Sequence, residues 1–220
     1  MRIPRWLNRQ SSRCVWRLAL DISRIQTYLL VWVSVVINQS RITAFELSRI
    51  IAQSLELDIA VCKEVGRDSF FEFSPDDDAV YIASIPLRDI EEMEKRTPST
   101  AVSYDILLAE ARETAMTCSY CTDFRDCFLY GVFAILHEFG HLDAHRRLSL
   151  SDFMRLASER GRYVAQLKMK LQIAANFGHD EIDSRRDYEL GYRSIPFEKI
   201  ADDYAKKLMP RVLASLIAKD

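Results

Sequence analysis

The sequence of 220 residues predicts a single α+β domain that is mostly helical and carries one small sheet. Three observations predict this class. Hydrophobic residues recur with helical spacing over most of the chain, whereas a short stretch between residues 59 and 84 reads as strands separated by turns. Hydrophobic residues make up 49% of the chain and Gly and Pro only six each, as in an ordinary globular protein with one core.

Residues 1–40 are predicted to form an Arg-rich amphipathic helical segment that precedes a main domain over residues 41–220. Residues 1–27 contain six arginines, no lysine and a single acid, Asp21. Hydrophobic residues recur at steps of three and four from Val15 to Val36, which favours one amphipathic helix. We expect residues 14–37 to pack on the body or on a partner subunit. A basic arm and an organelle transit peptide are the alternatives.

The next elements are one helix and three short strands. Thr43 and Glu46 have the spacing of a capping box, so a helix is expected to begin there. Strands are expected over residues 59–65, 70–73 and 80–84, with turns at 66–69 and 75–78. We expect these strands to form a small antiparallel sheet.

The second half of the chain is predicted to be helical. Helices are expected over residues 102–116, 128–146, 151–176 and 180–192, the third of them broken at Gly161. Pro196 is well placed in the first turn of a last helix, which is expected to stop before Pro210 and to be followed by a short tail helix.

The main motif is His-Glu-x-x-His, formed by His137, Glu138 and His141. On a helix, residues i and i+4 lie one turn apart on the same face, so both imidazoles can reach one zinc ion at about 2.0–2.1 Å. Glu138 is rotated away from that face and can act as the base that takes the proton from a zinc-bound water. The alternative is that these histidines are hydrogen-bonded residues of the core.

A catalytic zinc site needs a third protein ligand. His145 would require three turns of one straight helix to converge on one metal, and His179 is isolated in the sequence. Glu198 lies in the first turn of the predicted last helix, and Asp202 follows one turn later, where it could accept a hydrogen bond from a ligating imidazole. From these residues alone, a solvated side chain is the favoured interpretation of Glu198.

Two blocks of the sequence together resemble the ImmA/IrrE-type zinc metallopeptidases. The first is His137-Glu-Phe-Gly-His141, and the second is Glu198-x-x-Ala-Asp202-x-Tyr-Ala-x-x-Leu-Met-Pro210. The resemblance spans roughly residues 43–210, and the segment between the blocks is long for the family. It implies a zincin-like fold with the sheet beside the motif helix, His137, His141 and Glu198 as zinc ligands, and Glu138 as the base.

The predicted function is therefore a zinc-dependent endopeptidase that hydrolyses a peptide bond in a specific intracellular protein, such as a repressor. The alternative is a non-catalytic regulatory or assembly protein that retains a zincin fold. A third hypothesis, an organelle-imported peptidase, requires residues 1–27 to be a transit peptide.

Charge and hydropathy limit the classes of partner and the cellular compartment that we expect for this protein. The net charge of −2 gives no general attraction to nucleic acid, so no direct nucleic-acid binding is expected. The hydrophobic run over residues 28–37 is too short to span a bilayer, and no secretory signal is evident. We expect a cytoplasmic protein, in which the five cysteines are reduced.

Three of these cysteines, Cys118, Cys121 and Cys127, form a Cys-x-x-Cys pair plus one more. A structural zinc site usually takes four ligands, and only Cys14 or Cys62 could complete one. Ordinary reduced thiols are favoured, with a second metal site or a redox-sensitive pair as the alternatives.

Overall fold

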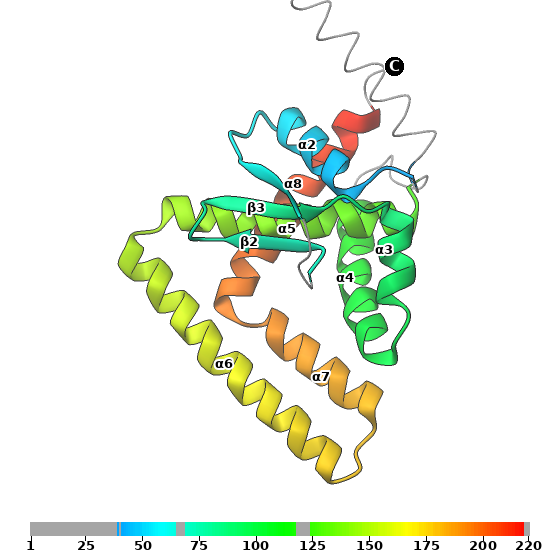
Figure 1. Cartoon of the computed structure of the whole chain (residues 1–220), viewed down its shortest axis with the longest axis vertical. Coiled ribbons are helices and arrows are strands. Elements are labelled where there is room, and N and C mark those ends of the chain that lie inside the picture. Colours follow the sequence, from blue (N-terminus) through cyan, green and yellow to red (C-terminus); the bar gives the residue numbers. More distant parts are fainter. Residues whose placement is uncertain (1–38, 40, 65–68, 118–123, 218–220) are drawn as a thin grey trace, which may run out of the picture. The chain divides into compact units, whose positions relative to one another are not determined.

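The computed structural model describes residues 39, 41–64, 69–117 and 124–217. The predicted N-terminal helix, and with it the proposed boundary at residue 40, lies outside these residues. The described elements are α2 (Ala44–Ser54), β1 (Val61–Glu64), β2 (Phe71–Ser74), β3 (Ala79–Ala83), α3 (Leu87–Glu94), α4 (Pro98–Met116), α5 (Asp126–Arg147), α6 (Leu150–Asn176), α7 (Glu181–Arg193) and α8 (Pro196–Ile217). The predicted class, mostly helical with one small three-stranded sheet, is confirmed (Figure 1).

Local sequence signals explain where several helices begin. The capping box predicted at Thr43 is formed, since its hydroxyl accepts from the backbone N–H of Glu46 and the Glu46 carboxylate accepts from the backbone N–H of Thr43. Ser149 and Asp180 cap α6 and α7, since their side chains accept hydrogen bonds from backbone N–H groups of the first turn. The sequence did not predict α3, which buries only Leu87 and Ile90.

The sheet is mixed, with strand order β1-β3-β2. β1 pairs in parallel with β3, in the register Val61 opposite Val80, whereas β2 pairs antiparallel with β3. The expectation of an antiparallel sheet is therefore wrong for β1. The β2–β3 hairpin places β2 on one side of β3, and β1 then pairs with the remaining edge of β3, in the same direction. Within the described sheet β2 is therefore an edge strand, and the backbone N–H of Phe73 on this strand donates to Glu138 of α5.

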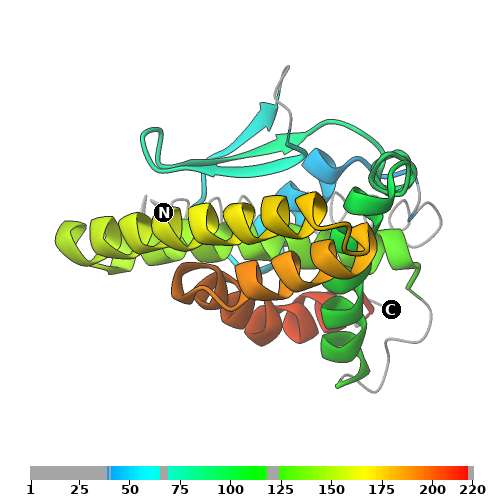
Figure 2. The same ribbon diagram turned by 90° about the horizontal axis from the view of Figure 1, so that it is seen from below.

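Helix α5 is the centre of the fold. It packs against β2 and β3 on one side and most extensively against α8 on the other, as Figure 2 shows from below. Its buried residues surround the whole helix from Cys127 to Ala144, so it lacks the polar face of a surface helix. The two histidines of the motif are therefore buried in the packed interior, whereas Glu138 is partly exposed.

Two predicted helix breaks are absent. Helix α6 continues through Gly161, and α8 continues through Pro210 to Ile217. Proline removes one backbone hydrogen bond, but Met209, Val212 and Leu213 on either side of it are completely buried. Packing against the core outweighs the local cost, so the predicted stop and separate tail helix are corrected to one helix.

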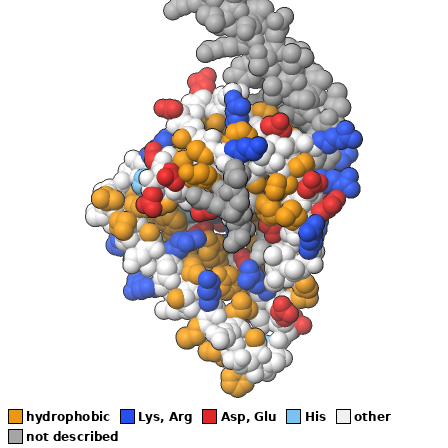
Figure 3. All heavy atoms as spheres, in the orientation of Figure 1, with side chains coloured by type: hydrophobic (Ala, Val, Ile, Leu, Met, Phe, Trp, Pro, Cys, Tyr) orange, Lys and Arg blue, Asp and Glu red, His pale blue; other side chains and the backbone are white. Residues whose placement is uncertain are grey.

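The long segment between the two motif blocks forms a helical hairpin of α6 and α7, which extends away from the sheet (Figure 1). Near its base, Phe153 and Leu156 of α6 join a small cluster with Ile195 and Phe197. Farther out its large hydrophobic side chains are exposed, and Figure 3 shows hydrophobic surface at that end (Met169, Ile173, Phe177 and Ile182). Among the described helices, none combines the length and hydropathy needed to cross a membrane.

Candidate metal centre

The two histidines of the motif project from one face of α5. Their Nε2 atoms lie 3.1 Å apart, and the two rings are nearly perpendicular, at 86°. Both residues are buried, with 8% of His137 and 5% of His141 exposed. The ring of Phe197 stacks on His141 with a centroid separation of 4.5 Å, which fixes that imidazole from the side of α8.

Glu198 completes the cluster from the first turn of α8. Its Oε2 lies 3.3 Å from Nε2 of His137 and 3.4 Å from Nε2 of His141, and the residue is fully buried. The approach of α8 to α5 depends on Gly140. A Cβ added there would lie 2.8 Å from the Cα of Ala201, so only glycine permits this helix contact.

Charge interactions within the cluster are strong. Burial lowers the pKa of His137, but the hydrogen bond to Asp202 and the nearby carboxylate of Glu198 outweigh it and raise that pKa to about 9. Burial likewise raises the pKa of Glu198, yet its contacts with the two imidazoles dominate and hold that pKa far below its usual value. The carboxylate of Glu198 is therefore ionised at neutral pH, as a metal ligand must be.

The geometry of this triad fits a tetrahedral metal ion. Ligand atoms held at about 2.0–2.2 Å from a tetrahedral zinc lie about 3.3–3.6 Å apart. The two separations that involve Glu198, 3.3 and 3.4 Å, lie within this range, and the separation of 3.1 Å between the two histidine nitrogens is slightly below it. Moreover, Oε2 of Glu198 is buried without a hydrogen-bond partner in the described structure, an arrangement that is costly unless a cation completes it. His137, His141 and Glu198 thus form a buried group that could hold a metal ion.

Asp202 lies behind the triad, one turn after Glu198 on α8. Its Oδ1 accepts a hydrogen bond of 2.8 Å from Nδ1 of His137. In the neutral imidazole this contact places the proton on Nδ1, which is the tautomer whose Nε2 could bind a metal ion in the cluster. The same Oδ1 accepts from Nη2 of Arg193, at the end of α7.

Glu138 points to the other side of the cluster, toward the sheet. Its Oε2 accepts a hydrogen bond of 2.9 Å from the backbone N–H of Phe73 in the edge strand β2. Glu138, both histidines and Glu198 line one pocket of about 630 Å³, whose walls include β2 and the base of the α6–α7 hairpin. The triad and Glu138 therefore line the same cavity.

The structure adds one functional candidate that the sequence did not identify, Arg160. Arg160 of α6 donates from Nε to Oε1 of Glu198, and from Nη2 to the hydroxyl oxygen of Tyr192, at 2.6 Å. No local motif marks Arg160, because it meets Glu198 only through the folding of the hairpin. The only available signal was the unusual length of the segment between the motif blocks.

The remaining predicted residues lie elsewhere. Nδ1 of His145 is 3.2 Å from a carboxylate oxygen of Asp78 in the β2–β3 turn, and His179 is exposed beyond the end of α6. Cys118 and Cys121 lie outside the described residues. Cys127 is buried in the first turn of α5, where burial raises the pKa of its thiol and so disfavours the reactive thiolate.

The chain matches no protein-family model, and comparisons with curated proteins and with solved structures found no significant match either. The function is therefore inferred from the geometry of this site and from the residues that form it.

Proposed function

We propose that the protein is a zinc-dependent endopeptidase of the ImmA/IrrE type that cleaves a specific cytoplasmic protein, such as a repressor. The observation that carries this proposal is the buried convergence of His137, His141 and Glu198, with Glu138 beside them in the same pocket. In this proposal the first three residues hold the metal. Two nitrogen ligands and one carboxylate, with room for a water, are the donor set of peptidase zinc sites.

Zinc bound there would acidify a water molecule and polarise the carbonyl group of the substrate. Glu138 then acts as general base and takes a proton from the attacking water. The N–H of Phe73 fixes one oxygen of Glu138, which holds the carboxylate in one rotamer while its other oxygen can accept the proton. Asp202 keeps His137 in the tautomer that presents Nε2 to the metal.

The shape of the pocket favours an extended peptide as substrate. In the described sheet β2 pairs only with β3, and the pocket is lined by Phe71, Glu72 and Phe73 of β2 and by the flanking residues Ser69, Phe70 and Pro75. An edge strand can pair with an extended chain through its backbone groups. The hydrophobic walls, which include Phe71, Phe73 and Tyr130, suit substrate side chains.

The test combines zinc stoichiometry with cleavage of a quenched fluorescent peptide library. The zinc-loaded protein should contain about one zinc per chain and should cleave library peptides. Glu138→Gln should retain the zinc and lose about 10²–10⁴-fold in rate, since the amide can still accept from the N–H of Phe73 but cannot take a proton.

The outcomes separate the competing functions. A protein that remains folded and binds no zinc would contradict the proposal. Stoichiometric zinc without cleavage of any library peptide would favour the non-catalytic regulatory or assembly protein. Cleavage that survives in Glu138→Gln would show that Glu138 is not the base.

A further inference from the structure

Glu198 uses its two carboxylate oxygens for different partners. Oε2 is directed at the two imidazoles, at 3.3 and 3.4 Å, whereas Oε1 accepts a hydrogen bond from Nε of Arg160. The side chain of Glu198 is only 1% exposed, so water does not compete for either oxygen. Arg160 reaches it from α6, across 38 residues of sequence.

Arg160 is itself held in place from several sides. Its Nη2 donates to the hydroxyl oxygen of Tyr192 in α7, and its guanidinium lies over the rings of Tyr192 and Phe197, at 5.5 and 6.0 Å from their centroids. Although burial lowers the pKa of Arg160, the neighbouring Tyr192 and Glu198 outweigh it and raise that pKa, so the side chain stays charged. The guanidinium therefore connects α6 and α7 with α8 at a fixed position.

We propose that Arg160 is a positioning residue of the metal centre, which holds Oε1 of Glu198 so that Oε2 stays directed at His137 and His141. This inference rests on the proposed zinc site. It gives the long segment between the motif blocks a function, because the α6–α7 hairpin carries the residue that orients the third ligand.

The physical reason is preorganisation. Without Arg160, Oε1 would be a buried acceptor without a partner, and the carboxylate would rotate toward solvent in the metal-free protein. Zinc binding would then have to reverse that rotation, which weakens affinity. The positive charge of Arg160 acts in the opposite direction, since it repels a metal cation nearby. The sign of the change in affinity therefore distinguishes positioning from simple charge repulsion.

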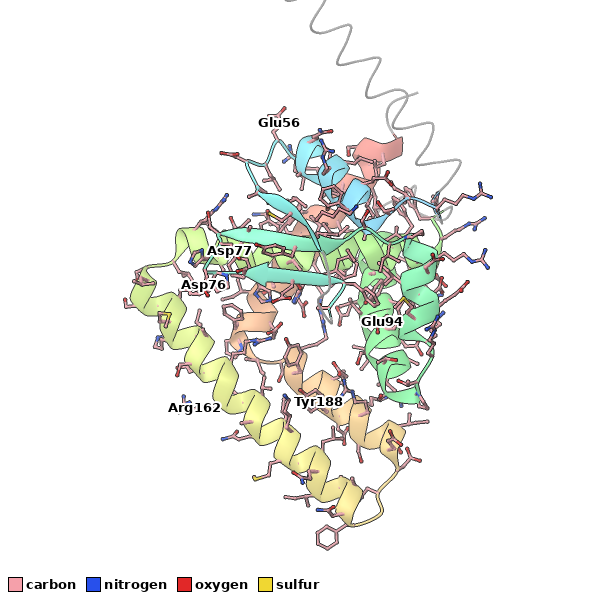
Figure 4. All side chains as sticks on the ribbon, viewed as in Figure 1. Glu56, Asp76, Asp77, Glu94, Arg162 and Tyr188 are labelled. Atoms are coloured by element: carbon pink, nitrogen blue, oxygen red, sulfur yellow. The ribbon has the colours of Figure 1, made fainter. Side chains whose placement is uncertain are left out.

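The test measures the Kd for Zn²⁺ of the full chain by competition with a chromogenic chelator. Arg160→Gln should raise the Kd about 10–100-fold, the usual cost of losing a residue that orients a metal ligand. Arg160→Lys should give an intermediate Kd, because it keeps the charge but loses the planar fork. The matched control is Arg162→Gln, whose side chain is exposed on the outer side of α6 in Figure 4 and should leave the Kd unchanged.

A double-mutant cycle with Glu198→Gln tests whether Arg160 acts through Glu198. In that background Arg160→Gln should change the Kd far less than in the wild type, whereas a merely structural role of Arg160 predicts additive effects. An unchanged or lower Kd in Arg160→Gln, or additivity in the cycle, would overturn the inference.

Two further outcomes are decisive. If Arg160→Gln fails to fold, Arg160→Lys carries the test, and a wild-type Kd in that variant overturns the inference. If the wild type binds no zinc, the proposed function fails and this inference with it, whereas tight zinc binding that is insensitive to Arg160 removes this inference alone.

Discussion

Oδ1 of Asp202 lies 2.8 Å from Nδ1 of His137, although the two residues are 65 positions apart in the sequence. The contact connects the helix that carries the motif with the helix that carries Glu198. It also defines which imidazole nitrogen is available to a metal, because a proton held on Nδ1 leaves Nε2 as the acceptor. This relationship leads to the first prediction.

Asp202→Ala should weaken zinc binding about 10–100-fold without abolishing it, since the three candidate ligands remain while His137 loses the partner that orients it. The Kd for Zn²⁺ measures the effect. Asp203→Ala is the matched control, because Asp203 is the next residue of α8 and is exposed. Equal affinities of the two variants would contradict an orienting function for Asp202.

Most residues of this site are predictable from the sequence, because they lie in two short blocks with helical spacing. The spacing of His137 and His141 on one helix and of Glu198 and Asp202 on another follows from helical periodicity alone. The distance between the two helices does not, because it depends on packing at Gly140 and along α8. The candidate ligands are therefore predictable from the sequence, but only the fold brings them within 3.4 Å of one another.

The incorrect predictions, of an antiparallel sheet and of a helix end before Pro210, also arise from long-range packing. Strand positions were predicted within about two residues, but the pairing of β1 with β3 depends on long-range contacts that no local pattern encodes. The predicted stop at Pro210 relied on local propensity, which the buried residues around it override. Arg160 had no local signal at all.

The second prediction concerns the contact between α5 and α8. Gly140→Ala places a methyl group 2.8 Å from the Cα of Ala201 and 3.0 Å from its carbonyl oxygen, and a backbone cannot give way as a flexible side chain can. We expect the variant to lose about 1–3 kcal/mol of unfolding free energy and to bind zinc more weakly, because α8 must shift and carry Glu198 with it.

Gly161→Ala provides the comparison for Gly140→Ala. Nothing lies within 4 Å of a Cβ added at Gly161, inside α6. Alanine favours a helix interior over glycine, so this variant should gain about 0.5–1 kcal/mol and keep wild-type zinc affinity. Chemical denaturation and zinc titration measure both effects. A Gly140→Ala protein with unchanged stability would show that the helices are not tightly packed there.

The third prediction is a pH dependence that arises at Glu94, in the last turn of α3 (Figure 4). Burial, with a smaller contribution from the charge of Glu189, raises the pKa of Glu94 above its usual value. The native state therefore binds this proton more tightly than the unfolded state does. The protonated carboxyl group of Glu94 therefore contributes to stability below about pH 4.5, and this contribution is lost as the pH rises through the raised pKa.

Glu94→Gln removes the ionised carboxylate but keeps the size of the side chain. Its Tm should exceed that of the wild type at pH 7.5, and the difference should shrink toward zero at pH 4. Glu92→Gln, on the exposed side of the same helix, should change stability by no more than about 0.5 kcal/mol at either pH. A Tm difference for Glu94→Gln that is the same at both pH values would contradict the assignment.

The fourth prediction compares the three candidates for the third ligand. Asp202→Ala is expected to weaken zinc binding about 10–100-fold, and Glu198→Ala should weaken it further. The reason is that Glu198→Ala removes a donor atom, whereas Asp202→Ala removes a residue that orients one. His145→Ala should keep zinc affinity, although it can lower the Tm, since His145 contacts Asp78 and packs at 4.7 Å from the ring of Phe153. His179→Ala, at an exposed position, should change neither quantity.

Zinc titration and thermal unfolding of the same three variants separate loss of a ligand from loss of packing. If Glu198→Ala bound zinc as tightly as the wild type while His145→Ala or His179→Ala did not, the ligand assignment and the proposed endopeptidase mechanism would both be wrong.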